Sequence, residues 1–155
     1  MTAKKLESLE ILLVEDNPGD VRLTQEALKE TKKPHRLSVV RDGIEALAFL
    51  RKEGEYRGAA NPALVLLDLN LPRKDGREVL GEMRRDPALR DIPVIVLTAS
   101  QADRDMLESG NLNANYINKP PAADELANVM ATPHVFFATA VKPRRRQKSP
   151  AKGKK

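Results

Sequence analysis

Five side chains that can do chemistry stand at the ends of short apolar runs in this sequence. They are three carboxylates, one hydroxyl and one ammonium: Glu15, Asp16, Asp68, Thr98 and Lys119. If the runs are strands of an open parallel sheet, these groups meet at the edge where such sheets gather their chemistry. Three clustered carboxylates raise each other's pKa unless a cation lies among them. Oxygen ligands without His or Cys favour a hard octahedral ion, so the pattern predicts a magnesium site.

The lysine of this group has a role distinct from that of the acids. Lys119 cannot replace a metal ion, but its ammonium can balance the charge and suits a phosphoryl oxygen as a point charge. Each acid taken alone is explained equally well as a residue that ends a strand on a solvated rim. The coincidence of all five groups at one edge of successive strands favours a site.

Several other classes of site and protein are excluded by composition. The chain has no cysteine, which excludes disulfides, thiolate nucleophiles and Cys-ligated metal centres. We expect His35 and His134 on the surface or in loops, so a Ser–His–Asp type of hydrolase has no support. Apolar runs are far shorter than the ~18 residues of a membrane helix. The first run leads directly into acids, unlike a signal peptide, so we expect a cytoplasmic protein without a membrane segment.

The elements that must position the five groups follow from two alternating patterns. Short apolar, β-branched runs predict strands at 11–14, 37–40, 64–67, 94–97 and 115–117. Segments of helical period predict helices near 18–32, 43–53, 75–85, 101–109 and 121–132. Apolar runs with little alternation are typical of strands buried on both faces of a parallel sheet. The repeats therefore predict an α/β fold, a doubly wound five-stranded parallel sheet with helices on both faces.

Local signals define the ends and buried faces of these helices. Asn17 followed by Pro18 predicts the start of the first helix, because Asn caps free amides and Pro fixes the first turn. Pro133 is expected to stop the last helix. Spacing of i, i+3, i+4 predicts two buried stripes, Ile44, Leu47 and Ala48 in the second helix and Leu126, Val129 and Met130 in the fifth.

The charge of the chain divides into two parts of opposite sign. The 155 residues carry 27 Lys plus Arg and 22 Asp plus Glu, a net charge of +5. Eight of the basic residues and no acid lie in 142–155, which leaves residues 1–141 with 19 basic against 22 acidic side chains. An acidic domain with a basic tail is therefore predicted, and a uniformly basic nucleic-acid-binding surface is disfavoured.

Four stretches in a fixed order make the chain recognisable. They are ILLVEDN at 11–17, LLDLNLP at 66–72 followed by Asp75 and Gly76, VLTA at 96–99, and YINKP at 116–120. Over about residues 8–132 the chain strongly resembles the receiver domain of two-component response regulators. The resemblance implies a flavodoxin-like (βα)5 fold with strand order 2-1-3-4-5. It also implies a phosphoacceptor signalling protein, not an enzyme, which assists its own phosphorylation and dephosphorylation.

The resemblance assigns the phosphoacceptor and the metal ligands. Asp68 would accept a phosphoryl group from a histidine of a sensor kinase. Magnesium would be held by Asp16, Asp68 and the backbone carbonyl of Asn70, and Glu15 would contact it directly or through water. A carboxylate is a poor nucleophile toward phosphorus unless the incoming charge is neutralised, which agrees with this ligand set.

The resemblance also assigns a group of residues that respond to phosphorylation. Lys119 would bridge to a phosphoryl oxygen, and Thr98 would turn its hydroxyl toward the phosphoryl group. Ala99 leaves room beside that hydroxyl, and Tyr116 would change rotamer to fill the space behind it. The alternative for Tyr116 is a half-buried strand residue whose hydroxyl reaches water.

The remaining predictions concern the division into domains, the C-terminal segment and the binding partners. We divide the chain into a receiver domain at 1–132 and a segment at 133–155 with no output domain. The apolar arm at 134–141 is predicted to be buried against a second subunit in a homodimer, the alternative being that it folds back on its own domain. The basic tail is predicted to be disordered, and DNA or polyanion binding through it is the alternative function. DNPGD at 16–20 and DLNLPRKDG at 68–76 resemble regulators paired with bacterial phytochromes, which points to a bacteriophytochrome as the kinase.

Overall fold

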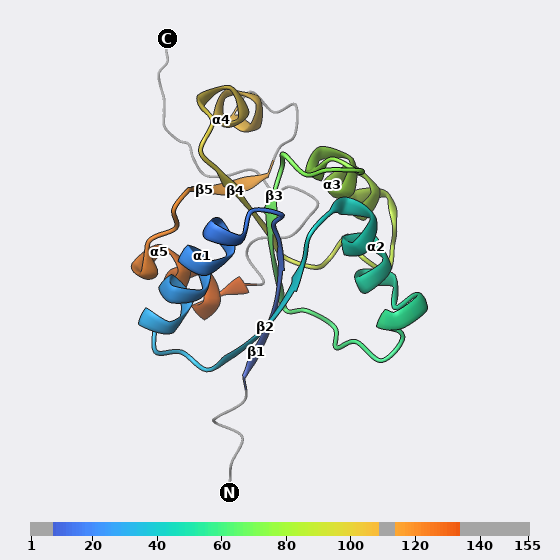
Figure 1. Cartoon of the computed structure of the whole chain (residues 1–155), viewed down its shortest axis with the longest axis horizontal. Coiled ribbons are helices and arrows are strands. Elements are labelled where there is room, and N and C mark those ends of the chain that lie inside the picture. Colours follow the sequence, from blue (N-terminus) through green and yellow to red (C-terminus); the bar gives the residue numbers. More distant parts are fainter. Residues whose placement is uncertain (1–7, 109–113, 134–155) are drawn as a thin grey trace, which may run out of the picture.

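The computed structural model describes residues 8–108 and 114–133. Its elements alternate along the chain between strands and helices (Figure 1). In order they are β1 (Leu9–Val14), α1 (Pro18–Glu30), β2 (His35–Val40), α2 (Gly43–Arg51), the 3₁₀ turn η2 (Gly54–Tyr56), β3 (Leu64–Asp68), α3 (Gly76–Arg85), β4 (Val94–Thr98), α4 (Gln101–Glu108), β5 (Asn115–Asn118) and α5 (Ala123–Ala131). All five predicted strand–helix units are present.

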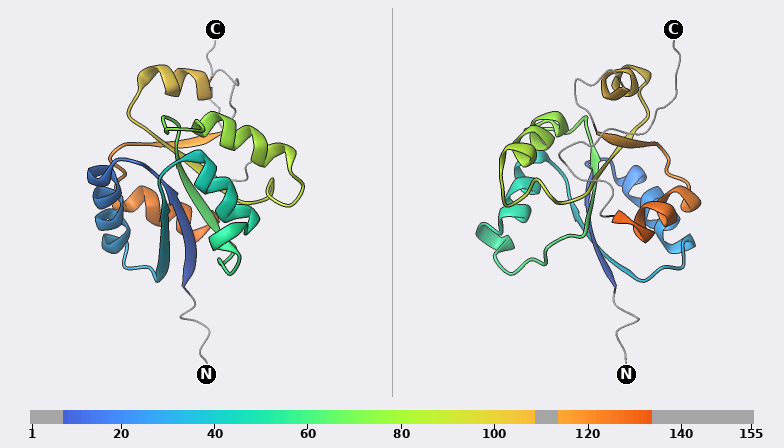
Figure 2. Two further views of the ribbon diagram at one scale, coloured as in Figure 1. Left: turned by 45° about the vertical axis from the view of Figure 1, so that its right-hand side comes forward. Right: turned by 180° about the vertical axis from the view of Figure 1, so that it is seen from behind.

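The strands form one parallel sheet in the order β2-β1-β3-β4-β5, as the resemblance implied. Helices α1 and α5 cover one face, and α2 and α3 cover the other (Figures 1 and 2). Helix α4 lies beyond the carboxyl ends of the strands and contacts β5 (Figure 2). The predicted doubly wound α/β fold is therefore confirmed.

The burial of the strands explains why their sequences are apolar runs. Every residue of β3 and of β4 is buried. Successive side chains point to opposite faces, so Ile11 and Leu13 pack toward α1 and α5 while Leu12 and Val14 pack toward α2 and α3. A strand in the middle of two helical layers needs apolar side chains on both faces. The edge strand β2 is buried only at Val40, and polar and apolar residues are mixed in its sequence, unlike those of β3 and β4.

Three of the predicted helix features are confirmed. Asn17 caps α1, since its Oδ1 accepts a hydrogen bond of 3.0 Å from the backbone N–H of Asp20, and Pro18 is the first helical residue. The stripe on α5 is also as predicted, because its buried residues are Leu126, Val129 and Met130. The helix ends at Ala131, just before Pro133.

The predicted stripe on α2 is wrong at one position. Ile44 is 45% exposed, whereas Leu47 is buried and Ala48 is half-buried. The buried face of α2 consists of Gly43, Ala46, Leu47, Phe49 and Leu50. This face includes the helix start, where a Cβ on Gly43 would lie 2.0 Å from the carbonyl oxygen of Lys74, so the backbone of α2 lies against the loop before α3 there. With Gly43 on the packed face, the adjacent Ile44 faces outward.

The other differences concern element boundaries. Helix α1 ends at Glu30 and α2 at Arg51, each one turn or less before the predicted end. Asp75 caps α3 through a reciprocal pair of bonds with Glu78, so this helix begins at Gly76. His35, which was expected on the surface or in a loop, is the first residue of β2 and is half-buried. His134 lies outside the described residues.

Candidate active site

The five predicted groups all lie at the carboxyl edge of the sheet. Glu15 and Asp16 directly follow β1, Asp68 and Thr98 are the last residues of β3 and β4, and Lys119 directly follows β5. Parallel strands that share a register bring these ends together, so the topology accounts for the grouping. An open cleft of about 570 Å³ lies at this edge and is lined by Glu15, Asp16, Asn17, Pro18, Asp20, Asp68, Asn70, Ala99, Ser100 and Lys119.

The acids of this cleft form a compact carboxylate cluster. One oxygen of each of Glu15, Asp16 and Asp68 lies within 4.8 Å of the others. Glu15 is 1% exposed and Asp68 is 6% exposed, whereas Asp16 is exposed. The backbone N–H of Asn70 donates a hydrogen bond of 3.0 Å to Asp68 Oδ1. Two of the three charges are therefore held out of water, which requires a neutralising group nearby.

Lys119 is that neutralising group in this structure. Its Nζ donates to Asp68 Oδ2 at 3.1 Å and to Asp20 Oδ2 at 3.1 Å, and it lies 2.8 Å from Glu15 Oε1. Burial by itself lowers the pKa of Lys119, but the carboxylates of Glu15, Asp68 and Asp20 outweigh burial and raise its pKa above the ordinary range. Lys119 is therefore charged throughout the physiological pH range.

Glu15 has the most perturbed carboxyl group of the cluster. Desolvation by burial is the largest cause and raises its pKa to about 7, with a further increase from the Asp68 charge and a partial offset from Lys119. Its Oε1 accepts no hydrogen bond among the described residues, despite the ion-pair distance to Lys119. A buried oxygen with unused acceptor capacity, in a cluster that offers only oxygen ligands, fits a divalent ion such as magnesium.

The loop after β3 holds the remaining predicted ligand, Asn70, at the cleft. Gly76 begins α3 so close to the strand that a Cβ there would lie 2.3 Å from the carbonyl oxygen of Asp68. Its N–H also donates a bond of 2.8 Å to the carbonyl of Leu69. Only glycine permits this approach, and the tight return places Asn70 beside Asp68 at the cleft.

The cleft does not include all of the predicted switch residues. Thr98 is 3% exposed, and its Oγ1 accepts a bond of 3.1 Å from Ser100 N–H and donates one of 3.4 Å to Ser100 carbonyl. Ala99 and Ser100 line the cleft in its place. Tyr116 is half-buried and does not line the cleft. It packs against a small apolar cluster of Leu69, Val96 and Leu107.

Four residues of the site region were not found from the sequence. Asp20 binds Lys119, and a signal for it exists, since it lies in the first turn of a helix whose cap was recognised. Ser100 lines the cleft, and its Oγ accepts a bond of 3.1 Å from Asp103 N–H at the start of α4. Asp103, which is buried, forms an ion pair with the half-buried Arg77. The spacing of Asp103 and Arg77 from the acids contains no signal of this contact.

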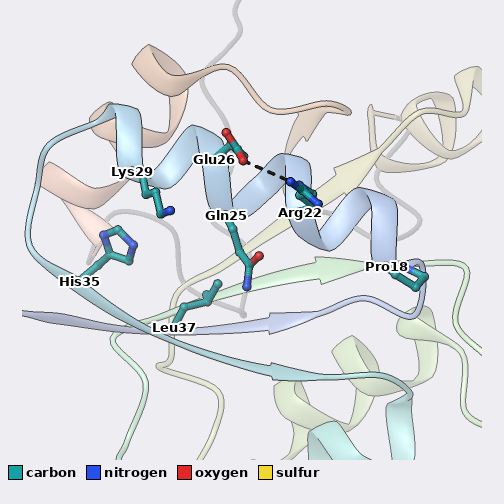
Figure 3. Close-up of a pocket in the computed structure, with 7 residues that line it drawn as sticks. All are labelled: Pro18, Arg22, Gln25, Glu26, Lys29, His35 and Leu37. Carbon is teal, nitrogen blue, oxygen red and sulfur yellow. Dashed lines mark ion pairs between the residues drawn. The ribbon is translucent and has the colours of Figure 1, made fainter.

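A second cleft lies away from the acids, between α1 and the edge strand β2 (Figure 3). It is lined by Pro18, Arg22, Gln25, Glu26, Lys29, His35 and Leu37. Arg22 and Glu26 form an exposed ion pair of 3.8 Å across one helical turn. None of the predicted site residues lies in this second cleft, so the chemistry is concentrated at the carboxyl edge.

The chain matches the response regulator receiver domain family over residues 11–131. It is similar to the response regulator Rcp1 of Synechocystis sp., with 52% identity over 132 residues that make up 84% of this chain and 90% of that protein. A crystal structure of the Mn²⁺-bound form of Rcp1 has 44% identity and a TM-score of 0.66, and covers 88% of this chain and 99% of that one.

Two further solved structures are similar. The phosphorylated cyanobacterial phytochrome response regulator RcpA has 50% identity and a TM-score of 0.67, with 80% of this chain and 89% of that chain covered. The bacteriophytochrome response regulator AtBRR has 40% identity and a TM-score of 0.74, with 84% and 95% covered. Within residues 8–108 and 114–133, no helix has the length and apolar character to cross a bilayer. This chain, with its metal-binding acid cleft on a five-stranded parallel sheet, belongs to the receiver domains of two-component response regulators.

Proposed function

We propose that this chain is a phosphoacceptor that receives a phosphoryl group on Asp68 from a sensor histidine kinase. The observation that supports this role is the position of the Asp68 carboxylate, next to two further acids and bonded to Lys119 in an open cleft. An oxygen of Asp68 would attack the phosphorus of a phosphohistidine on the kinase. The P–N bond breaks and returns its electron pair to the histidine ring, and the new P–O bond creates an aspartyl phosphate.

The phosphoryl charge that enters the cleft must be neutralised by groups already in place. We assign the magnesium ligands to Glu15, Asp16, Asp68 and the backbone carbonyl of Asn70. Magnesium, when bound, neutralises charge on the phosphoryl oxygens and orients the group for in-line attack. Lys119 supplies a second positive charge, and its ammonium would exchange one carboxylate partner for a phosphoryl oxygen.

The signal would be produced by residues that move when the phosphoryl group is present. Thr98 Oγ1 would exchange its bonds with the Ser100 backbone for a bond to the phosphoryl group. Phosphorylation adds about −1.5 to −2 charges, so the new hydrogen bond is charge-assisted. Ala99 leaves room beside Thr98, and Tyr116 would fill the space behind it. Because Tyr116 lies in β5, this movement would change the protein surface near α4 and β5.

The direct test of this function is magnesium-dependent phosphorylation by acetyl phosphate. We expect intact-mass spectra to show one phosphoryl group per chain when magnesium is present. A chelator should remove this label, because Lys119 alone cannot offset three carboxylates and the incoming phosphoryl charge. Calcium at the same concentration is a suitable control for nonspecific screening by a divalent ion, since its longer bonds fit a different site size. Equal labelling in the presence of chelator would contradict the metal assignment.

A second test concerns the switch residues. Beryllofluoride with magnesium stands in for the phosphoryl group, and in a Tyr56→Phe background Tyr116 is the remaining tyrosine in a chain without tryptophan. We expect its fluorescence to change when beryllofluoride is added. The change should be much smaller in Lys119→Ala, because the group that binds the phosphoryl oxygen is then missing. A full response in that variant would show that Lys119 does not carry the coupling.

The similar proteins support a proposal for which kind of sensor kinase donates the phosphoryl group. RcpA and AtBRR are phytochrome response regulators, so we propose a bacteriophytochrome kinase as the phosphoryl donor for this chain. The receiver domain would occupy 1–132 and would assist its own phosphorylation and dephosphorylation. The apolar arm at 134–141, with its predicted homodimer contact, and the basic tail lie outside the described residues. These features, the alternative of DNA or polyanion binding and the cytoplasmic location stay predictions.

A further inference from the structure

Asp103 is a buried carboxylate that the phosphoacceptor chemistry does not use. It lies in the first turn of α4 and is 5% exposed. Its Oδ1 accepts a hydrogen bond from Arg77 Nη2, and its Oδ2 accepts one of 3.2 Å from Asn70 Nδ2. A carboxylate held out of water is costly unless it is paired and hydrogen-bonded. The two partners of Asp103 therefore decide where the first turn of α4 can lie.

Both partners belong to the segment that follows the phosphoacceptor strand. Asn70 is two residues after Asp68, and its backbone N–H bonds the Asp68 carboxylate at 3.0 Å. Arg77 is in the first turn of α3, and its Nη1 also contacts both oxygens of Asp75, at 3.2 and 3.0 Å. Asp103 thus joins the loop 69–75 and the start of α3 to the start of α4.

The backbone of Asp103 is also hydrogen-bonded, through Ser100, to Thr98. Asp103 N–H donates a bond of 3.1 Å to Ser100 Oγ, and Ser100 N–H donates one of 3.1 Å to Thr98 Oγ1. A continuous set of hydrogen bonds therefore runs from Asp68 through Asn70, Asp103 and Ser100 to Thr98. It passes through the first turn of α4 without using Lys119 or Tyr116.

We propose that Asp103 is a positioning residue, which holds Asn70 so that its backbone carbonyl is presented to the metal and which ties α4 to that loop. This inference rests on the proposed function, because it takes Asn70 carbonyl as a magnesium ligand. The Asn70 side chain bonds Asp103, so its orientation restricts the peptide that carries the carbonyl. Partners that orient a metal ligand typically change metal affinity by 10–100-fold when they are removed.

The test measures magnesium affinity by titration calorimetry, without any phosphorylation. Asp103→Ala is expected to weaken magnesium binding about tenfold, at the low end because the carbonyl belongs to the backbone. Asn70→Ala keeps its carbonyl and should have a similar effect. Both changes break the same hydrogen bond, the one between Asn70 and Asp103. The double variant should therefore bind magnesium no more weakly than the single variant with the lower affinity. Asp105→Ala is the matched control, an exposed acid two residues along the same helix, and should bind magnesium as wild type does.

Amide hydrogen exchange provides a second readout that does not depend on Asp103→Ala being folded. In Asn70→Ala we expect faster exchange in the first turn of α4 than in wild type, because Asp103 has lost one partner. Unchanged exchange in α4 would overturn the linkage. Wild-type magnesium affinity in Asp103→Ala, or an additive loss in the double variant, would overturn the positioning role.

Failure of this inference is distinguishable from failure of the proposed function. If wild type binds magnesium and is labelled on Asp68 while Asp103→Ala matches its affinity, only the role of Asp103 is wrong. If wild type binds no magnesium, the ligand assignment on which both depend is wrong.

Discussion

Asp68→Asn is expected to abolish phosphorylation by acetyl phosphate, with labelling below detection. An amide has no anionic oxygen to attack phosphorus, and the change also removes one negative charge from the metal cluster. The side chain is close in shape, and its oxygen can still accept the hydrogen bond that Asn70 N–H donates to Oδ1. The variant should therefore fold, so the loss reports chemistry and not unfolding. Intact-mass spectrometry of variant and wild type, with magnesium, measures the result.

The control for this experiment is an acid that is exposed but lies outside the cleft. Asp105 on α4 is exposed and bonds only Gln101 among the contacts resolved for it. Asp105→Asn should be labelled to the same extent as wild type. A circular dichroism melt of Asp68→Asn verifies that it is folded. A phosphoryl group that persists in folded Asp68→Asn would place the acceptor at another residue.

Lys119→Ala is expected to lower the free energy of unfolding by about 3 kcal/mol near pH 8 when magnesium is chelated. The ammonium lies within 3.1 Å of oxygens of Glu15, Asp20 and Asp68, and it is 14% exposed. Its removal leaves the buried Glu15 and Asp68 without a counter-charge, which is the costly way to break a buried ion pair. Magnesium should restore part of the loss because it neutralises the same acids.

The free energy of unfolding lost in Lys119→Ala should be smaller at lower pH. The direction of this pH dependence follows from the pKa of Glu15. Its pKa is raised from 4.5 to about 7 on folding, so the folded protein binds more protons than the unfolded chain between those values. This contribution to stability is fully present below 4.5 and is lost as the pH rises through 7. Without Lys119, which lowers the pKa of Glu15, that pKa rises further. The carboxyl is then neutral near pH 5.5 and needs no counter-charge.

Urea denaturation at about pH 5.5 and about pH 8, with chelator, measures both effects. Comparison of the variant with wild type at each pH cancels the contributions of the other titrating groups, which the two proteins share. Lys119→Met separates charge from packing, because it keeps a long apolar stem in the cleft without the ammonium. If Lys119→Met is as stable as wild type at both pH values, the ion pairs contribute nothing measurable and the electrostatic account of the cleft is wrong.

The fold was predictable because its signals are local. The strands β1, β3 and β4 are buried on both faces, so their sequences must be apolar runs, and these runs were visible directly. Asn17 capped α1 as predicted, since a cap requires only residues a few positions apart. The edge strand β2 was predicted too short at its start because an edge strand is half-buried and needs fewer apolar residues.

The error at Ile44 has a different origin. The spacing of Ile44, Leu47 and Ala48 is compatible with a buried stripe, and so is the spacing of Gly43, Ala46, Leu47 and Leu50. The choice depends on how α2 rotates against its neighbours. Its packed face includes the close approach of Gly43 to the backbone of Lys74, 31 positions away, and no local pattern contains such a contact.

The order of residues along the chain is enough to say which chemical groups this protein gathers at one edge of its sheet. Each of these groups ends a strand, and parallel topology then requires their proximity. How these groups pair with one another depends on the packing of distant segments. Lys119 bonds Asp20 and Asp68, which are 99 and 51 positions away, and Thr98 turns its hydroxyl to Ser100 and not to the cleft. The burial that raises the pKa of Glu15, and the link from Asp103 to Asn70, arise from side chains brought together by packing. Such contacts depend on rotamers and distances between elements, which a local sequence pattern does not specify.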